Sequence, residues 1–444
     1  MKETQLQIPL PGVPKAKQGR EVPQKWAWTE ASVWTERMLA TLEGGIKGGQ
    51  WFSLIDKVWK WENLQSAAEQ VLRNKGGAGV DGQSCEEFRK HAPERLVRLQ
   101  EEIRSGSYTP QPVKRVWIPK LGSKELRPLG VPTVDDRTVQ TSVRNVIEPI
   151  FENIFAEHSY GFRPGRGAKD ALRRVDHLLK AGKVWVVDAD LKGYFDSIPQ
   201  DKLLAAVAEQ ISDGALLDLL GKMLRQGVLE SGKGWKPTEA GTPQGAVVSP
   251  LLANIYLNPL DHLMARAGKE MVRYADDFVV LCDSETEAQE VLEMVRAWVA
   301  AAGLTLHPTK TRIVDASQEG GFDFLGYHFE RGYRWPRAKS IDKFRETIRE
   351  KTRRLNPRPM REIVAEVNRT LRGWFEYFRH SVKNVFAKED RFVRQRLRTL
   401  QRRRHKGLGR ARGRDHQRWP NAYFAELGLI SLALARAKAS RSQR

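Results

Sequence analysis

Two apolar segments that contain aspartates constrain the fold most strongly. The first runs from Lys183 to Asp190 and is apolar enough for a central strand, yet it ends with Asp188 and Asp190 on one face. Burying unpaired carboxylates is costly, so such groups are usually paired with a cation or bound to a metal. Tyr194 and Phe195 follow just beyond this segment. The pattern therefore favours a metal site beside an aromatic wall.

The second segment, Met271 to Leu281, is predicted to form two short strands joined through Asp276 and Asp277 at the tip of a hairpin. Paired aspartates at a turn are common on protein surfaces, so this hairpin alone does not identify a site. Together with Asp190, three carboxylates at the ends of neighbouring strands can hold two Mg²⁺ ions for phosphoryl transfer. Asp188 shares a face with Asp190, so strand geometry leaves both open as ligands.

A glycine-rich loop and a basic hairpin precede these segments. The loop, residues 74–82, contains Lys75, but most loops of this kind are plain turns. Residues 115–132 alternate like two strands, with Lys120 and Arg127 on either side of a turn. A lysine and an arginine so placed can hold the phosphates of a nucleoside triphosphate. The alternative is a solvated hairpin with ordinary surface charge.

The charge balance indicates a polyanionic partner. Lys and Arg number 75 against 54 Asp and Glu, a formal net charge of +21 with a pI near 9.9. Nucleic acid fits this excess best, and a ribosomal or membrane-surface protein is the alternative. With 444 residues, 40% of them hydrophobic, the chain exceeds what one core usually organises. We therefore expect two or three globular domains.

The cysteines and the apolar runs exclude several protein classes. Cys85 and Cys282 lie far apart and outside any Cys-x-x-Cys or Cys/His cluster, so neither a disulfide framework nor a zinc site is expected. The longest apolar run, Leu427 to Ala435, is too short to span a bilayer, and the N-terminus is polar. These features predict a protein of the reducing cytosol with no membrane partner.

Several sequence blocks resemble those of one family. Tyr274-Ala275-Asp276-Asp277 resembles the signature of reverse transcriptases, and the surrounding blocks are similar to those of group II intron-encoded reverse transcriptase/maturases. The joint order of the blocks is more specific than any one of them; they are residues 127–132 (RPLGVP), 160–166 (YGFRPGR), 241–245 (GTPQG), 249–257 (SPLLANIYL) and 324–327 (FLGY). The resemblance implies an α/β (α+β) fold: a right-hand polymerase with fingers and a ferredoxin-like palm, then an α-helical thumb/maturase domain and a basic C-terminal tail.

The resemblance assigns the catalytic roles. Asp190, Asp276 and Asp277 match the family's metal-binding triad, which implies two Mg²⁺ ions as cofactors. Phe195 matches the aromatic gate that crowds a ribose 2′-OH, so deoxynucleotides should be preferred. Asp188 is expected to be structural, because the spacing to Phe195 favours Asp190 as the ligand.

Further residues resemble the family's contacts with nucleotide and nucleic acid. Lys120 and Arg127 resemble fingers residues that hold the incoming triphosphate, and Gln244 resembles a residue that contacts the nucleotide near its sugar. The glycine-rich loop resembles a motif that contacts template RNA, and residues 324–327 lie where the family places its primer grip. Candidate nucleic-acid contacts in these blocks are Lys75, Arg163 and Arg166.

The chain beyond Tyr333 is predicted to be helical and basic. Apolar residues recur at helical spacing in three amphipathic stretches, around 341–348, 363–378 and 392–397. Residues 401–444 carry 12 Lys/Arg and 2 Asp/Glu, which is typical of a tail that binds nucleic-acid backbones. The aromatic stripe of these helices should be core, which leaves arginines as candidates for RNA contact: Arg369, Arg372, Arg379, Arg402, Arg403 and Arg404.

These features predict four parts of the chain. They are an N-terminal extension (1–58), reverse transcriptase fingers and palm (59–335), a helical thumb/maturase domain (336–400) and a basic DNA/RNA-binding tail (401–444). Because no Cys pair or His-rich segment follows the tail, the resemblance implies the bacterial form without the family's optional endonuclease domain. Such a protein would lie in the bacterial cytosol and associate with the nucleoid through DNA.

The sequence leaves three functions open. The first is an RNA-directed DNA polymerase that copies intron RNA into DNA and assists group II intron splicing and retromobility, with intron RNA, DNA target and primer, and dNTPs as partners. The second is a domesticated relative in DNA repair or phage defence, and the third is a non-enzymatic RNA-binding splicing factor. Ala275 resembles the mobile-intron form, and the aspartate triad with Phe195 and Gln244 argues against the third. The oligomeric state is not predicted.

Overall fold

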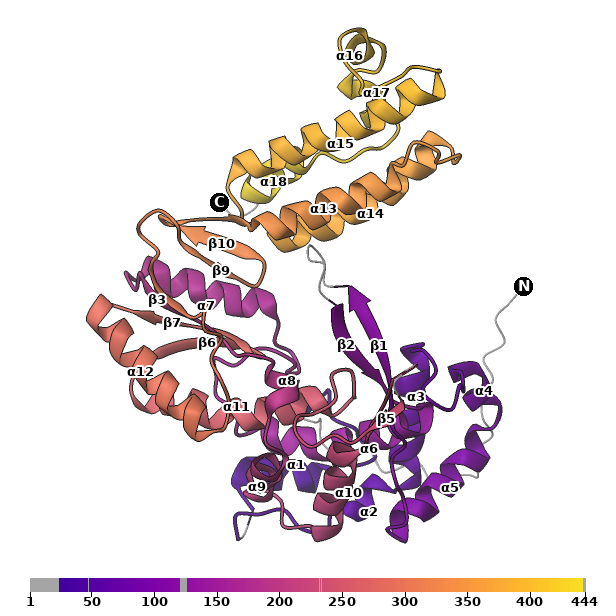
Figure 1. The fold of residues 1–444 in the computed structure, drawn as a ribbon, viewed down its shortest axis with the longest axis vertical. Coiled ribbons are helices and arrows are strands. Elements are labelled where there is room, and N and C mark those ends of the chain that lie inside the picture. Colours follow the sequence, from indigo (N-terminus) through magenta and orange to yellow (C-terminus); the bar gives the residue numbers. More distant parts are fainter. Residues whose placement is uncertain (1–23, 47, 120–125, 231, 233, 442–444) are drawn as a thin grey trace.

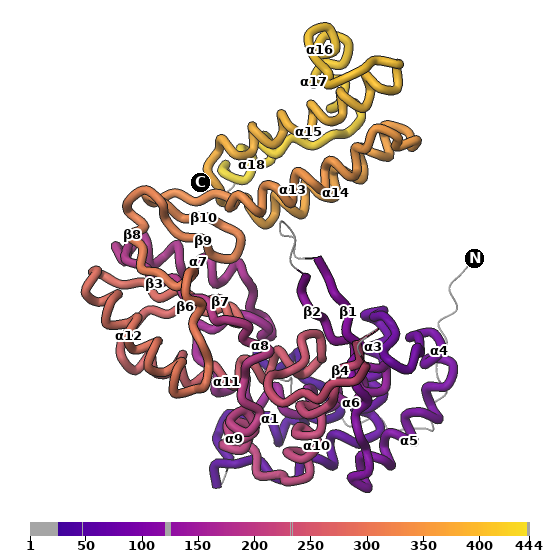
Figure 2. Tube along the Cα trace, viewed as in Figure 1, coloured from indigo at the N-terminus to yellow at the C-terminus, as the bar shows by residue number. Residues whose placement is uncertain are grey.

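The described part of the chain combines small β-sheets with many helices and ends in a group of helices alone (Figures 1 and 2). The computed structural model describes residues 24–441 except 47, 120–125, 231 and 233. Lys120, predicted to hold a triphosphate, therefore lies outside the described residues.

An antiparallel sheet, here called the central sheet, carries the two carboxylate segments. Its strands are β3 (Trp185–Asp190), β6 (Glu270–Tyr274), β7 (Asp277–Cys282) and β8 (Arg312–Asp315), in the spatial order β6-β7-β3-β8. Helices α11 (Ser249–Arg266) and α12 (Glu285–Ala301) pack on one side, and α7 (Ala168–Lys180) packs against β6 and β7. The strand and hairpin predicted from the sequence are confirmed, and their order has the strand-helix-strand-strand-helix-strand succession of a ferredoxin-like domain.

Alternation along the strands sorts the side chains of this sheet into two cores. Val186 and Val279 belong to the core shared with α7 and the C-terminal helices, whereas Val187, Ala189 and Phe278 belong to the core of α11 and α12. Because both faces are covered, these strands are apolar almost throughout. A polar residue here needs a partner or a place at the strand end.

The N-terminal half packs helices around a second sheet, here called the hairpin sheet. Strands β1 (Val113–Pro119) and β2 (Leu126–Val131) form the predicted basic hairpin, and β4 (Val228–Glu230) pairs with β1 in parallel and with β5 (Gly234–Lys236) antiparallel. In the same half, α3 (Trp61–Arg73), α5 (Ala92–Arg104) and the long α6 (Val134–Glu152) pack against one another. The remaining helices of this half are η1 (Gln24–Trp26), α1 (Glu36–Gly44), α2 (Ile55–Val58), α4 (Cys85–Lys90), α8 (Tyr194–Ser197), α9 (Gln200–Ala208) and α10 (Gly214–Arg225).

The N-terminal segment is anchored by tryptophans. Trp26 and Trp34 are buried in the same core as α3, α6 and α11, and the indole N–H of Trp34 donates to the carbonyl oxygen of Asn145 at 3.0 Å. Residues 24–58 therefore share their core with the rest of the N-terminal half, in the part that is described.

A small sheet leads into the C-terminal helices, here called the helical domain. Strands β9 (Phe322–Phe324), β10 (Tyr327–Glu330) and β11 (Tyr333–Pro336) precede α13 (Ala338–Lys351), α14 (Met360–Phe378) and α15 (Lys383–Arg404). These are the three amphipathic helices expected from the sequence, and their aromatic stripe is core: Trp374 packs against Phe344 and Phe378 at ring-centroid distances of 4.6 and 5.1 Å.

The basic residues after 400 are folded onto this domain. Helix α15 continues to Arg404, so the expected boundary at 400 falls within it. Beyond it lie α16 (Arg414–Arg418), α17 (Asn421–Glu426) and α18 (Leu432–Arg441), and the buried Asp390 of α15 accepts the backbone N–H of Leu432 at 2.9 Å. Every helix in the described residues falls short of the length and apolar character that crossing a membrane requires.

A buried ion pair fixes the β6–β7 hairpin. Arg273 on β6 is fully buried, and its guanidinium donates to Asp261 of α11 at 2.7 Å, to the side chain of Asn254 at 2.9 Å and to the carbonyl oxygen of Ala275 at 2.8 Å. Ala275 lies in the turn that carries Asp276. The Arg273 side chain therefore holds the β6–β7 turn against α11.

We predict that Arg273→Met destabilises the protein by about 3–5 kcal/mol, because Asp261 would keep its buried charge without a partner. Urea unfolding at pH 7 measures this free energy. The control is Arg173→Met, which removes an exposed arginine paired with Asp170 and should cost less than about 1 kcal/mol. Equal losses in the two variants would contradict the assigned role of Arg273.

Candidate active site

The strand register brings the predicted carboxylates together at one end of the central sheet. Asp190 is the last residue of β3 and lies directly opposite Asp277, the first residue of β7. Directly opposed residues of an antiparallel pair have Cβ atoms about 4.5–5.5 Å apart and point to the same face. Ala275 and Asp276 form the two-residue turn between β6 and β7, so Asp276 directly precedes Asp277. Asp188 lies on β3, two residues before Asp190.

The electrostatics of this cluster are those of crowded, partly buried acids. Burial, and after it the neighbouring charges of Asp188, Asp276 and Asp190, raise the pKa of Asp277 to about 7. Burial and, less strongly, Asp190 raise the pKa of Asp276, and burial raises that of Asp188 to about 6. The site therefore has more negative charge than its surroundings compensate.

Two cations outside the predicted set contact this cluster. The ammonium of Lys310 lies 2.8 Å from a carboxylate oxygen of Asp190, and the guanidinium of Arg312 lies 3.4 Å from Asp188. Lys310 precedes β8 by two residues and Arg312 is the first residue of β8, the strand next to β3 in the sheet. Sequence reasoning missed them, since neither lies in a block with a recognisable pattern.

The donor set fits a hard divalent cation. Carboxylate oxygens are the ligands that Mg²⁺ prefers, and a divalent ion would compensate the mutual repulsion of Asp190, Asp276 and Asp277. Among the described residues, no group of three or more His, Cys, Asp or Glu side chains is arranged so that it could hold a metal ion without a change in side-chain positions. Asp190, in contact with Lys310, would have to exchange that ammonium for the ion.

The turn between β6 and β7 is packed too closely to be rearranged. Ala275 has a positive φ of 60°, a conformation that few non-glycine residues adopt. Gly161 lies against it so tightly that a Cβ at Gly161 would stand 2.3 Å from the backbone nitrogen of Ala275. Asn254 holds this glycine by donating to its carbonyl oxygen at 2.7 Å. The contact with this turn therefore explains why residue 161 of the 160–166 block is glycine.

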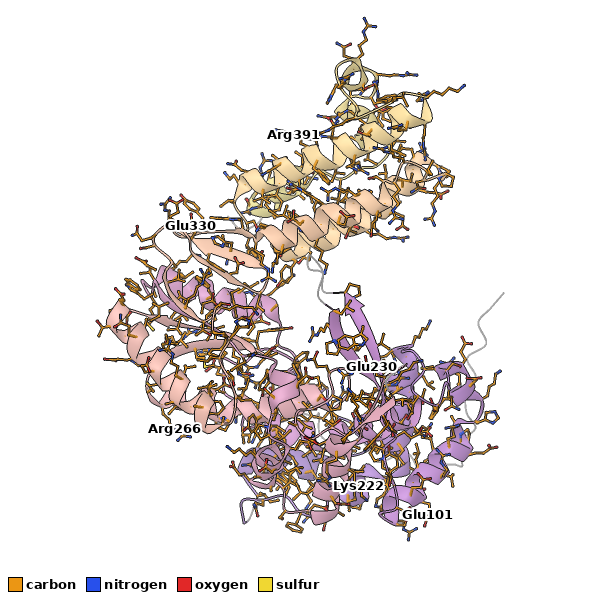
Figure 3. All side chains as sticks on the ribbon, viewed as in Figure 1. Glu101, Lys222, Glu230, Arg266, Glu330 and Arg391 are labelled. Carbon is orange, nitrogen blue, oxygen red and sulfur yellow. The ribbon has the colours of Figure 1, made fainter. Side chains whose placement is uncertain are left out.

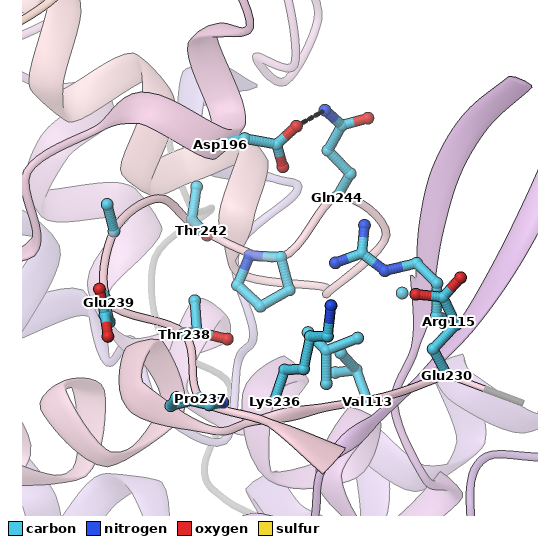
Figure 4. Close-up of a pocket in the computed structure, with 14 residues that line it drawn as sticks. Val113, Arg115, Asp196, Glu230, Lys236, Pro237, Thr238, Glu239, Thr242 and Gln244 are labelled. Carbon is cyan, nitrogen blue, oxygen red and sulfur yellow. Dashed lines mark hydrogen bonds between the residues drawn. The ribbon is translucent and has the colours of Figure 1, made fainter. Parts of the chain in front are cut away.

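A polar chain connects the hairpin sheet to this site. Arg127 of β2 donates through Nε to the amide oxygen of Gln244 at 3.0 Å, and the amide nitrogen of Gln244 donates to Asp196 at 3.2 Å. The structure thus brings together two residues predicted to bind nucleotide, and it adds Asp196, which the sequence reasoning did not single out. Figure 4 shows Gln244 turned toward Asp196 beside a cavity of about 310 Å³.

The backbone explains why these residues meet. The N–H of Gly130 in β2 donates to the carbonyl oxygen of Gln244 at 2.6 Å, and a Cβ at Gly245 would stand 2.4 Å from the carbonyl oxygen of Gly130. Only glycine allows this approach of loop and strand. Phe195 is buried beside them, and its carbonyl oxygen accepts the N–H of Thr242 at 2.7 Å.

A second cavity adjoins the carboxylates on the side of the helical domain. It has a volume of about 670 Å³ and is bounded by Tyr274 and Asp277, by the Leu325–Gly326 turn, and by α13 and α14. Of the expected primer-grip segment, the side chains of Phe324 and Tyr327 are buried in the core, so its turn alone reaches the cavity. The helical domain thus forms one wall of the candidate active site.

Two donors in this cavity lack a partner. In the described part of the chain, the buried indole N–H of Trp374 and the Nε of Arg337 make no hydrogen bond, and both residues line the cavity. Buried donors are normally satisfied, so these two, whose nitrogens are covered by the protein, are exceptions. Lys343 adds a positive charge to the same wall.

The structure does not support Arg163 as a nucleic-acid contact. Its side chain is buried, donates to both carboxylate oxygens of Glu152 at 2.7 and 2.9 Å, and donates to the carbonyl oxygen of Ser159 at 2.8 Å. The Arg163 guanidinium thus bonds to groups inside the protein, and these bonds stabilise the 160–166 turn. Arg166 lies partly exposed on the same turn, over the ring of Tyr160 at 5.9 Å.

The glycine-rich loop is also explained by packing. The carbonyl oxygen of Gly77 accepts a hydrogen bond from Arg137 of α6 at 2.8 Å, and a Cβ at Gly79 would stand 2.7 Å from the backbone of Thr133. The loop therefore uses its glycines to approach the start of α6. Lys75, exposed and with a positive φ of 50°, projects at its edge.

The arginines predicted to bind RNA differ in their surroundings. Arg369 is exposed and pairs with Glu366 at 2.7 Å, Arg379 lies 3.6 Å from Glu376, and Arg372 is exposed. Arg402 is held by Asp415 at 2.6 Å, whereas Arg403 is half-buried. Arg404 donates to the carbonyl oxygen of Asn356 at 3.2 Å, which fastens the loop before α14.

Comparisons with known proteins match this architecture. The family model for reverse transcriptase (RNA-dependent DNA polymerase) matches residues 118–329, and that for the group II intron, maturase-specific domain matches residues 341–419. The first range contains the carboxylates and the Arg127–Gln244–Asp196 chain, and the second contains the helical domain through α16. The chain thus has an RNA-dependent DNA polymerase domain, a class that uses divalent metal, nucleic acid and dNTPs.

Individual proteins are similar to parts of this chain. Protein YkfC of Escherichia coli (strain K12) is 33% identical over 347 residues, which cover 69% of this chain and 86% of YkfC. Group II intron-encoded protein LtrA of Lactococcus lactis subsp. cremoris is 39% identical over 199 residues, 45% of this chain and only 33% of LtrA. A solved telomerase from Candida albicans is similar with a TM-score of 0.40 and 10% identity, over 73% of this chain and 64% of that one. The chain belongs to the group II intron reverse transcriptase/maturase family.

Proposed function

We propose that the protein copies group II intron RNA into DNA by two-metal-ion nucleotidyl transfer, and that it assists splicing and mobility of its intron. The observation that carries this proposal is the register of β3 and β7, which sets Asp190 opposite Asp277 with Asp276 in the adjoining turn. In this arrangement the central sheet is the palm of a right-hand polymerase, the hairpin sheet belongs to the fingers, and α13–α15 form the thumb.

Three carboxylates would hold the metal ions. Asp190, Asp276 and Asp277 would supply hard oxygen ligands, and Asp277 also lines the 670 Å³ cavity. When bound, two Mg²⁺ ions lower the proton affinity of a primer 3′-oxygen and neutralise the leaving pyrophosphate. Arg273 keeps the turn of Asp276 in place, and Asp188 stays with Arg312, which agrees with a structural role.

The polar chain from the hairpin sheet would bind the incoming nucleotide. Arg127 has a planar guanidinium suited to phosphate oxygens, and its charge partly opposes the rise that burial causes in the pKa of Asp196 and of Asp276. Gln244 would contact the nucleotide at its sugar, and Phe195, next to Asp196, would exclude a 2′-OH. Lys120 is proposed as the second triphosphate contact on the resemblance alone.

The cavity between Asp277 and the helical domain would hold the primer end. Arg337 and Lys343 line this cavity, and their positive charges can attract the phosphate oxygens of one strand. Primer phosphates held here would present the 3′-oxygen to the carboxylates. Positioning of this kind supplies much of the rate enhancement in phosphoryl transfer.

The intron as substrate follows from the family. The maturase-specific match at 341–419 and the similarity to a group II intron-encoded protein support intron RNA as the partner, and the formal charge of +21 suits it. Lys75, Arg166, Arg369, Arg372, Arg379 and the cluster Arg402, Arg403 and Arg404 are the candidate contacts. Two Mg²⁺ ions, a DNA target and a DNA primer complete the proposed partners.

We predict that Asp276→Asn with Asp277→Asn lowers dNTP incorporation on an RNA template with a DNA primer by roughly a hundredfold or more, since metal ions contribute several kcal/mol to phosphoryl transfer. The double variant should still bind RNA and still stimulate splicing of a group II intron transcript, because neither needs the metal site. The matched control, Asp218→Asn with Asp283→Asn, removes two exposed carboxylates elsewhere and should extend primers normally.

Wild-type protein that binds RNA and stimulates splicing but never extends a primer would favour the non-enzymatic splicing factor. Primer extension without any effect on splicing would favour a domesticated polymerase. Either result would contradict the proposed function.

We predict that Asp196→Asn raises the KM for dNTPs about two- to tenfold with little change in kcat, the effect of losing one hydrogen bond. A carboxylate can only accept, so Asp196 directs the amide nitrogen of Gln244 toward itself and the amide oxygen toward Arg127. Steady-state kinetics of primer extension measure this. The control, Glu239→Gln, removes a charge from the same cavity without changing a partner of Gln244 and should leave the KM for dNTPs unchanged. Equal KM values in the wild type, Asp196→Asn and Glu239→Gln would refute the role of Asp196.

A further inference from the structure

A pocket at the free end of the helical domain is surrounded by arginines. It has a volume of about 340 Å³ and lies between the end of α13, the second half of α15 and the loop that follows α15. Figure 1 places this end of the domain away from the central sheet. The residues around it are Arg349, Arg354, Phe392, Gln395, Arg396, Thr399, Gly409 and Arg410.

The walls of this pocket, here called the arginine pocket, are held in place by hydrogen bonds. Gln395 donates to the carbonyl oxygen of Ala411 at 2.6 Å, and the hydroxyl of Thr399 accepts the N–H of the same residue at 3.3 Å. These two bonds fix the loop that presents Arg410. Arg396 donates to the hydroxyl and the carbonyl oxygen of Thr352, each at 3.1 Å, so its guanidinium is also fixed.

The positive charge of the arginine pocket is not compensated by the residues around it. In the described part of the chain no carboxylate lines the pocket, and of its four arginines only Arg349 has an acidic partner, Glu346 at 2.9 Å. Burial and the nearby charges of Arg349 and Arg354 lower the pKa of Arg396. The guanidinium of Arg349 lies over the ring of Phe392 at 5.6 Å, which orients it further. The arginine pocket is therefore a fixed, positively charged site of the kind that suits an anion.

The arginine pocket lies on a different face of the helical domain from the candidate active site. Ser340, Lys343 and Thr347 of α13 line the cavity beside Asp277. Arg349 follows Ser340 by nine residues, which at 3.6 residues per turn places it on the opposite side of the helix. A ligand of the arginine pocket is therefore separate from a primer held beside the carboxylates.

We infer that the arginine pocket binds a backbone phosphate of RNA, outside the polymerase cleft. Arginine guanidinium groups match phosphate oxygens with paired N–H donors, and several fixed arginines around one pocket suit a single phosphodiester. All eight lining residues lie within the maturase-specific match at 341–419. That the RNA is intron RNA rests on the proposed function; that the pocket binds RNA phosphate does not.

The test removes the two arginines that are exposed and whose loss should spare the fold, Arg354→Gln with Arg410→Gln. The full chain is first saturated with a primer–template duplex, so that the cleft is filled, and is then titrated with a labelled group II intron transcript at several salt concentrations. The control, Lys383→Gln with Arg391→Gln, removes the same charge from exposed positions of α15 that do not line the pocket (Figure 3 labels Arg391).

We expect the pocket variant to bind the transcript at least about tenfold more weakly than the control, and the slope of log K against log salt to fall by about 1. Primer extension should be unchanged. A second variant, Arg396→Lys, keeps the charge but loses the fork, and should weaken RNA binding in the same direction.

Three results would overturn the inference. They are equal RNA affinity in the pocket and control variants, a loss confined to DNA of the same sequence, and a parallel loss of primer extension, which would assign the pocket to the cleft. Failure of the proposed function gives a different result: no stimulation of splicing by the wild type, with the pocket variant still weakened in binding RNA.

Discussion

The ion pair of Arg273 with Asp261 is the contact on which the candidate active site depends. The guanidinium is fully buried between β6 and α11 and holds the carbonyl oxygen of Ala275, so the catalytic turn rests on it. The same residue joins the strand to the preceding loop, because its backbone accepts the N–H of Tyr160 at 2.8 Å. An apolar side chain could fill the space, but it could not bond the turn and the helix at once.

The carboxylates of the candidate active site carry like charges that lower the stability of the folded protein. Asp190 and Asp277 face each other across two strands, and like charges directly opposite are destabilising. Arg312 and Lys310 compensate Asp188 and Asp190, and the pKa of Asp277 is raised to about 7. The crowded carboxylates therefore agree with the proposal that this site binds divalent cations. Stability given up at a functional site is a common cost of activity.

The sequence allowed the strands, the hairpins and the three long helices to be predicted, because each has a clear apolar period. It also allowed the carboxylate triad and the pair Arg127 and Gln244 to be named through the family's blocks. It did not reveal Asp196 or Lys310, whose importance comes from contacts with residues 48 and 120 positions away. Arg163 was misjudged for a related reason: its block resembles a nucleic-acid contact, but only the fold shows that Glu152 takes its charge.

The two faces of α13 suggest how polymerase and maturase activities could share one domain. One face, with Ser340 and Lys343, closes the cavity beside Asp277, whereas Arg349 on the opposite face belongs to the arginine pocket. A primer and a structured RNA held on opposite faces would not compete for the same donors. Because α13 packs on both α14 and α15, occupying one face can stiffen the helix that forms the other. Holding the intron RNA would then also steady the wall against which the primer is positioned.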